Sequence, residues 1–183
     1  MVVKRVLLLV LFGIVLLFAV DKDKDAALLP GDPAPMFFLR QLDENDFFLS
    51  RRVGDRARPG KKSPIVLSFF TNACIPCRKE IPHLTALQEE YTVPGIYLVN
   101  VGDDVDMVKK YVTKMKYNLP VLLDKYGMIA EKYKAEMTPT LVIISEEGKI
   151  LFYKQGFEDG DEKIISAKMK ELFGEKEAET PKE

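Results

Sequence analysis

Apolar residues along this chain follow two patterns, short continuous runs and longer stretches with helical spacing. The continuous runs are rich in β-branched and aromatic residues and predict buried strands over residues 65–70, 95–101 and 141–144. Helical spacing predicts helices over residues 74–91, 104–116, 125–133 and 158–173. Further extended runs cover residues 121–123 and 150–153, the second after a turn at residues 146–149. Strands separated by helices predict an α/β sandwich, with a central mixed sheet covered on both faces.

Two short apolar runs and a basic segment precede the first buried strand. Residues 36–39 and 47–49 flank a polar turn and predict an antiparallel hairpin. Residues 51–62 then carry four arginines and two lysines. We interpret this segment as a solvated loop, and a docking surface for an acidic partner or for lipid headgroups is the alternative.

Residues 1–20 have the pattern of a targeting segment. Lys4 and Arg5 precede an apolar run over residues 6–20. As a helix this run spans about 22 Å, less than the roughly 30 Å hydrocarbon core of a membrane, which favours a signal peptide. Leu17 stands where a small residue is usual before a cleavage site, so an uncleaved membrane anchor stays open.

A signal peptide and an uncleaved anchor both predict an exported domain, which is periplasmic or at the outer face of the cytoplasmic membrane. A charged linker is expected over residues 21–30, the domain over residues 31–173, and a charged, disordered tail over residues 174–183. The net charge of -1 argues against nucleic acid as a partner, and no glycine-rich phosphate loop is present in the sequence.

The two cysteines form the segment Cys74-Ile75-Pro76-Cys77 at the start of a predicted helix. A helix N-terminus stabilises a thiolate, and three-residue spacing places the two Cα atoms roughly 5 Å apart, within disulfide range. The pattern predicts a dithiol/disulfide exchange site. A structural disulfide and half of a metal site are the alternatives. No metal is expected, because zinc needs about four ligands and His83 is the only histidine.

With these motifs in place, the sequence resembles the extracytoplasmic thioredoxin-like proteins of the TlpA/ResA type, over residues 31–173. Three segments carry the resemblance: Gly31-Asp32-Pro33-Ala34-Pro35, Cys74 to Pro82, and Thr138-Pro139-Thr140. The resemblance implies a thioredoxin-like sandwich with an N-terminal β-hairpin extension. It also implies that the bond before Pro139 is cis and faces the cysteines, and that Thr138, Ile75 and Pro76 help to bind the partner.

The resemblance extends to an acidic residue near the dithiol. Residues 100–103 resemble a family segment with such an acid, whereas ordinary thioredoxins carry it on the strand before the cysteines, where this chain has Ser68. We therefore expect Asp103 to accept the proton of Cys77, and a helix N-cap is its alternative role. The family usually has one tryptophan directly before the first cysteine and another directly after the phenylalanine of the preceding strand. In this chain Ala73 and Phe70 occupy these two positions.

The implied activity is thiol-disulfide exchange outside the cytoplasm without a metal or organic cofactor. Cys74 would attack a partner disulfide and Cys77 would resolve the mixed disulfide. Expected partners are apocytochrome c or other exported proteins, with a membrane electron donor that restores the dithiol. A peroxiredoxin is the second interpretation, although Leu67 stands where peroxiredoxins have a proline ahead of the cysteine. A copper-binding or non-catalytic module of similar fold is the third interpretation.

Overall fold

The computed structural model describes residues 28–174. The predicted targeting segment, residues 21–27 of the linker and residues 175–183 of the tail lie outside this range, so their assignments stay predictions. Within residues 28–174, no helix has both the length and the apolar character needed to cross a membrane.

A five-stranded mixed sheet forms the centre of the domain, as predicted. Its strand order is β5-β4-β3-β6-β7. The central strand β3 pairs in parallel with β4 and antiparallel with β6. The five strands are β3 (Ile65–Phe70), β4 (Gly95–Val101), β5 (Val121–Asp124), β6 (Thr140–Ile144) and β7 (Ile150–Gln155).

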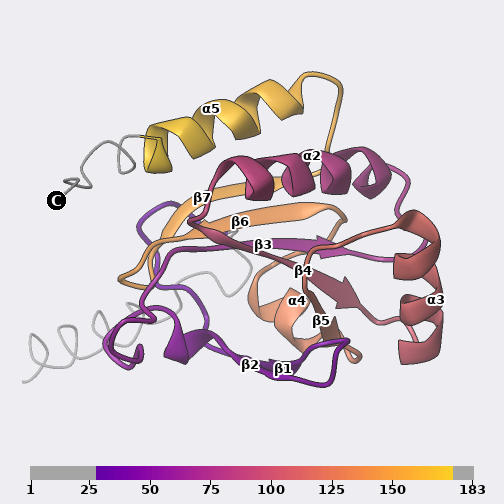
Figure 1. Cartoon of the computed structure of the whole chain (residues 1–183), viewed down its shortest axis with the longest axis horizontal. Helices are drawn as coiled ribbons and strands as arrows, with labels where there is room; N and C mark the ends of the chain where they lie inside the picture. Colours follow the sequence, from indigo (N-terminus) through magenta and orange to yellow (C-terminus); the bar gives the residue numbers. More distant parts are fainter. Residues whose placement is uncertain (1–27, 175–183) are drawn as a thin grey trace, which may run out of the picture.

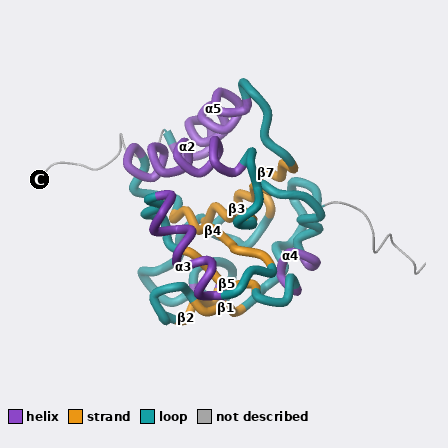
Figure 2. The backbone as a smooth tube through the Cα atoms, turned by 90° about the vertical axis from the view of Figure 1, so that its right-hand side faces the viewer, coloured by secondary structure: helices purple, strands orange, loops and turns teal. Residues whose placement is uncertain are grey.

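Different elements cover the two faces of this sheet, as Figures 1 and 2 show. Helices α2 (Cys77–Glu90) and α5 (Asp161–Phe173) lie over one face, and α3 (Val105–Met115) packs into the same core. The predicted hairpin, β1 (Phe38–Arg40) with β2 (Asp46–Phe48), lies over the other face together with the short helix α4 (Met128–Lys132). A 3-10 helix, η1 (Leu49–Arg51), follows the hairpin.

Strand β3 contributes to both cores because its side chains alternate between the two faces. Val66 and Phe70 belong to the core beneath α2, whereas the other core takes the odd-numbered positions, Ile65, Leu67 and Phe69. Burial on both faces explains why this strand is almost continuously apolar. Ser68 is the exception, fully buried on the α2 face of the strand.

The active-site helix begins later than predicted. The expected helix included Cys74, but α2 starts at Cys77, with Pro76 as its N-cap. Ile75 precedes a proline, and the proline ring disfavours helical geometry in the residue before it. The cysteine pair therefore straddles the helix boundary, and Cys74 lies in the turn before the helix.

A buried carboxylate joins the end of β5 to α4. Asp124, which is 2% exposed, accepts hydrogen bonds from the backbone N–H groups of Ile129 and Ala130 at 2.9 and 2.8 Å. Both donors are buried, so removing the carboxylate leaves them without a partner or access to bulk water. At α3, Asp104 makes a comparable cap to the N–H of Asp106 on the exposed surface.

We predict that Asp124→Ala lowers the free energy of unfolding by about 3 kcal/mol, because two buried donors lose a charged acceptor. Asp104→Ala is the matched control and should lower it by only about 1 kcal/mol, since water can replace an exposed cap. Urea denaturation of both variants measures the difference. Equal losses would contradict the structural role assigned to Asp124.

Candidate active site

The two cysteines form a disulfide at the C-terminal end of β3. Their Cα atoms are 5.4 Å apart, which agrees with the separation predicted from the sequence spacing. Cys77 is fully buried, whereas 6% of Cys74 is exposed. Cys74 is therefore the sulfur that an external thiol or disulfide reaches more readily.

The start of α2 favours negative charge on the Cys74 sulfur. The backbone N–H of Cys77 donates a hydrogen bond to Cys74 Sγ at 3.2 Å. Cys74 also lies next to the N-terminal, positive end of the α2 dipole. Both interactions strengthen when the sulfur becomes a thiolate, so they lower the energy of the nucleophilic form.

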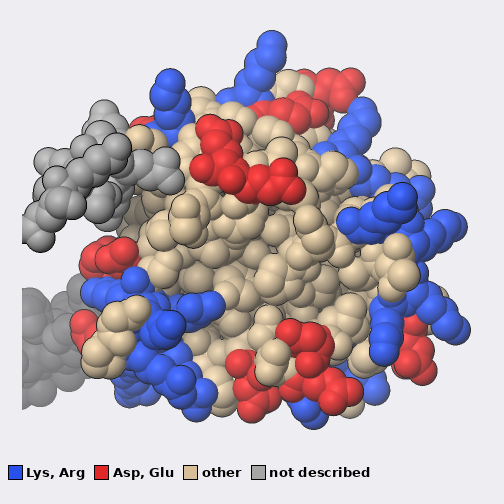
Figure 3. Space-filling view, in the orientation of Figure 1, with Lys and Arg blue, Asp and Glu red and all other residues tan. Residues whose placement is uncertain are grey.

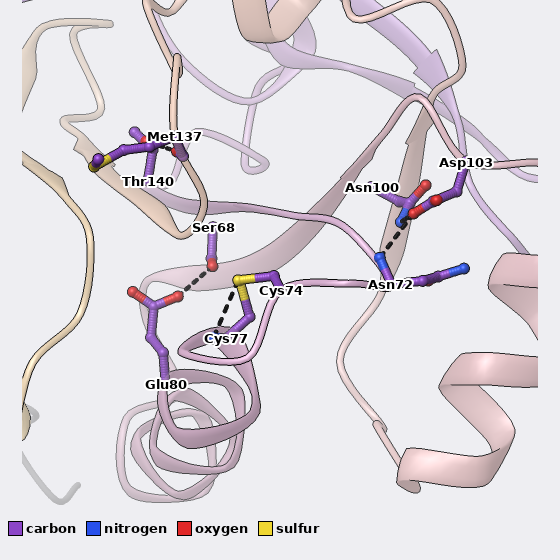
Figure 4. Close-up of a disulfide and its surroundings, with 9 residues drawn as sticks. All are labelled: Ser68, Asn72, Cys74, Cys77, Glu80, Asn100, Asp103, Met137 and Thr140. Carbon is purple, nitrogen blue, oxygen red and sulfur yellow. Dashed lines mark hydrogen bonds between the residues drawn. A yellow bond between two sulfur atoms is a disulfide. The ribbon is translucent and has the colours of Figure 1, made fainter.

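Glu80 is a buried acid on the same side of α2 as Cys77. It lies one helical turn after Cys77 and is only 1% exposed. Ser68 Oγ, from the central strand, donates a hydrogen bond to Glu80 Oε2 at 2.6 Å. Figure 4 shows this pair beside the disulfide. Burial raises the pKa of Glu80 to about 7, and the Ser68 hydrogen bond opposes part of that increase.

An ion pair from β7 and α5 adds charge to the surroundings of Glu80. Lys154 Nζ lies 2.9 Å from Asp161 Oδ2, and both side chains are largely buried. Leu141 pairs with Ser68 on one side and with Lys154 on the other, so the three residues form a row across the sheet. The positive charge of Lys154 lowers the pKa of Glu80, and the negative charge of Asp161 raises it.

Asp103 bonds to the loop that leads to the cysteines. Its Oδ2 accepts hydrogen bonds from the Asn72 backbone N–H at 2.8 Å and from Asn100 Nδ2 at 2.9 Å. In Figure 4 its carboxylate points toward these two residues. Asp104 is the N-cap of α3, so helix capping, which was the alternative role for Asp103, is performed by its neighbour. Proton transfer by Asp103 stays a prediction.

The peptide bond between Thr138 and Pro139 is cis, which confirms that prediction. Thr140 begins β6 opposite Phe69, near the end of β3 that leads into the cysteine turn. Pro139 therefore lies at the disulfide end of the sheet. The apolar side chains of Ile75 and Met137 near this end are 69% and 54% exposed. They provide apolar surface beside the disulfide for a polypeptide partner.

His83 is half-buried on the flank of α2 that contacts α5. Its Nε2 is 3.2 Å from Ser166 Oγ. Among residues 28–174, no group of three or more histidine, cysteine, aspartate or glutamate side chains has a geometry that could hold a metal ion.

Glu80 was not identified from the sequence, because it follows Arg78 and Lys79 in a segment that looks solvent-exposed. A helical signal was nevertheless present. Cys77, Glu80, Ile81 and Leu84 recur at the spacing of one helix face, and all four are buried. A charged residue within an otherwise apolar face indicates a buried acid. The ion pair of Lys154 with Asp161 joins a strand and a helix and has no comparable local signal.

Comparisons with known proteins agree with this geometry. Residues 30–153 match the AhpC/TSA family. The thiol-disulfide oxidoreductase ResA of Oceanobacillus iheyensis is 30% identical over 137 residues, which cover 74% of this chain and 69% of the relative. That coverage includes most of the described domain.

Two solved structures have the same fold. A thiol:disulfide interchange protein DsbE from Chlorobium tepidum aligns with a TM-score of 0.69 and 25% identity, covering 78% of this chain and 96% of that one. StoA from Bacillus subtilis aligns with a TM-score of 0.60 and 21% identity, covering 76% and 99% of the two chains. The thioredoxin-like sandwich is confirmed. The chain belongs to the AhpC/TSA family and is a ResA-like thiol-disulfide oxidoreductase with a Cys-x-x-Cys pair at Cys74 and Cys77.

Proposed function

We propose that this protein reduces disulfides of exported proteins, including apocytochrome c, outside the cytoplasm. The observation that carries the proposal is a disulfide in which Cys74 is slightly exposed and Cys77 fully buried, with the buried acid Glu80 one helical turn after Cys77. Similarity to ResA supports the exchange chemistry. The apolar segment of residues 6–20 supports export.

Reduction of a partner proceeds in two exchange steps. The Cys74 thiolate attacks one sulfur of the partner disulfide, so a Cys74–partner disulfide forms and the other partner sulfur leaves as a thiolate. The Cys77 thiolate then attacks Cys74 Sγ, closes the Cys74–Cys77 disulfide and releases the second partner sulfur. The dithiol loses two electrons and the partner disulfide gains them.

Glu80 is the proposed acceptor of the Cys77 proton. Cys77 is fully buried and needs a nearby base before it can attack. A carboxylate with a pKa of about 7 is partly ionised at neutral pH and can both take up and return this proton. Asp103 is a second candidate, from the other side of the cysteine turn.

The exposed surface beside Cys74 is the proposed binding site for the partner polypeptide. On one side of it lies half-buried Thr138, followed by the buried cis proline Pro139, and exposed Ile75 and Pro76 form the other side. Apolar contacts from Ile75 and Met137 bind without strict sequence preference, which suits a reductant that acts on several exported proteins.

Burial of Cys77 supports the reducing direction. An apolar environment disfavours a thiolate, so it gives the reduced pair little stabilisation and favours the disulfide. A couple that favours its disulfide donates electrons to partners. A membrane electron donor would then restore the dithiol, and residues 1–20 would keep the domain at the membrane if they stay attached.

Trapping separates the roles of the two cysteines. We predict that Cys77→Ser accumulates mixed disulfides with exported proteins, because the first step proceeds and the resolving thiol is gone. Cys74→Ser is the matched control and should trap none above background. Non-reducing gels and mass spectrometry of each variant in cells identify the adducts. Trapping through Cys74→Ser instead, or rapid peroxide consumption by the reduced wild type, would contradict the proposal.

The raised pKa of Glu80 predicts a specific pH dependence of stability. Folding raises this pKa from 4.5 to about 7, so the folded state binds the proton more tightly than the unfolded state. The associated stability is fully present below pH 4.5 and is lost as pH rises through 7. The loss amounts to about 3 kcal/mol for a shift of this size.

Denaturation of the oxidised protein between pH 4 and 8 measures this effect. Glu80→Gln cannot ionise, so the stability difference between this variant and the wild type should change by about 3 kcal/mol across that range. Asp103→Asn is the control and should keep the loss of stability with rising pH that ionisation of Glu80 causes. Parallel pH curves for wild type and Glu80→Gln would show that Glu80 does not titrate in this range.

The ion pair near Glu80 predicts opposite effects from its two members. Lys154→Met removes a positive charge and should raise the Glu80 pKa, whereas Asp161→Asn removes a negative charge and should lower it. Asp159→Asn removes the partner of exposed Lys79 and should leave the Glu80 pKa unchanged. Carbon NMR of the glutamate carboxyls, assigned with Glu80→Gln, follows the titration. Shifts in the same direction would contradict this account.

A further inference from the structure

The basic segment of residues 51–62 takes no part in the site described above. Lys and Arg side chains gather at the lower left of Figure 3, over the loop that joins β2 to β3. Four of them line a polar hollow of about 250 Å³ between this loop and the hairpin: Arg51, Arg52, Arg58 and Lys61. We call this hollow the basic pocket.

Aromatic rings position two of the guanidinium groups. The Cζ atom of Arg51 lies 3.6 Å from the centre of the Phe48 ring. Arg52 Nη2 donates a hydrogen bond to the hydroxyl of Tyr97, at 2.5 Å. Phe48 and Tyr97 both line the basic pocket. The two side chains are therefore held in place before a ligand arrives, which reduces the entropy lost on binding.

Backbone hydrogen bonds fold the loop so that distant cations converge. The N–H of Arg58 donates to the carbonyl of Arg51 at 3.2 Å, and that of Lys61 donates to the carbonyl of Arg58 at 3.0 Å. The N–H of Ser63 donates to the carbonyl of Arg52 at 2.9 Å, which closes the loop. Residues from both ends of the segment consequently face one hollow.

Cations outnumber acids among the residues that line the basic pocket. Asp46 is the carboxylate in its lining, and its closest cation is Arg40, at 3.9 Å. Among the described residues, none of the four lining cations forms an ion pair with an acid within 4.0 Å. Converging, unpaired guanidinium groups attract compact anions with several acceptor oxygens, and phosphate matches their forked geometry.

We propose that the basic pocket binds a phosphate group, either that of an anionic phospholipid headgroup or free phosphate. Four cations around one hollow suit a phosphate better than a single carboxylate, because a phosphate presents more oxygens to separate donors. This proposal does not depend on the redox chemistry of the cysteines.

The position of the basic pocket is consistent with the headgroup as the source. The loop leads into the N-terminal end of β3, whereas the disulfide lies beyond its C-terminal end. The first described residues lie at the same end as the loop, since Gly31 N–H donates to the Ile150 carbonyl and Gly54 N–H to the Glu146 carbonyl. The apolar segment of residues 6–20 precedes them in sequence. A headgroup in the pocket would leave the disulfide directed away from the membrane.

The test uses the full chain in neutral detergent micelles, with two probes. Inorganic phosphate is titrated in one arm, and phosphatidylglycerol is added to the micelles in the other. Arg58→Gln with Lys61→Gln removes two exposed cations that form no ion pair with an acid of residues 28–174. Lys163→Gln with Lys170→Gln makes the same charge change on exposed positions of α5 and is the matched control. Calorimetry measures binding, and disulfide exchange with a small thiol verifies the active site.

We expect the Arg58/Lys61 variant to bind at least about tenfold more weakly, and the α5 control to bind as the wild type does. Phosphate competing with phosphatidylglycerol identifies the headgroup as a ligand of the pocket, and binding of phosphate alone identifies the free ion. Equal losses in the two double variants, or no binding of either probe, would overturn the proposal. Exchange activity should be unchanged in all variants, so failure here leaves the redox function intact.

Discussion

A single hydrogen bond connects the central strand to the active-site helix: Ser68 Oγ donates to Glu80 Oε2 at 2.6 Å. It crosses an apolar core, where an acid without a partner would be costly to bury. Glu80 lies on the face of α2 that meets the sheet, and Cys77 lies on the same face, so both side chains point inward. Cys74 is left at the rim, with its sulfur on the helix N-terminus. The asymmetry between an accessible sulfur and a buried one follows from this arrangement.

Charge is distributed unequally between the two ends of the sheet. At the end with the disulfide, Glu80 lies in a core shared with Cys77, where the positive charge of Lys154 favours its carboxylate and the negative charge of Asp161 disfavours it. At the opposite end, four cations of the loop before β3 line one hollow, and none of them forms an ion pair with an acid of the described residues. A strand only six residues long separates the disulfide from the basic pocket. The two ends can therefore contact different partners at the same time.

Much of this fold could be predicted from local sequence. The limits of β3 could be predicted from the apolar run over residues 65–70, because the strand is buried on both faces. The resemblance to the family indicated the cis bond before Pro139. The start of α2 was predicted too early, because the restraint that Pro76 places on Ile75 outweighs helical periodicity. Glu80 was missed although its spacing from Cys77 and Ile81 placed it on the buried helix face. Lys154 was missed because its burial depends on packing against α5. The cysteines were found because their chemistry is encoded in four adjacent residues.

The reduction potential of the Cys74–Cys77 couple decides whether the buried pair donates or accepts electrons. It is measured by equilibrating the oxidised protein at pH 7 with a glutathione or dithiothreitol buffer of known reduction potential. A reductant of exported disulfides should have a potential at or below that of thioredoxin, about -270 mV. A potential near about -120 mV, typical of a strong oxidant, would contradict this reducing role.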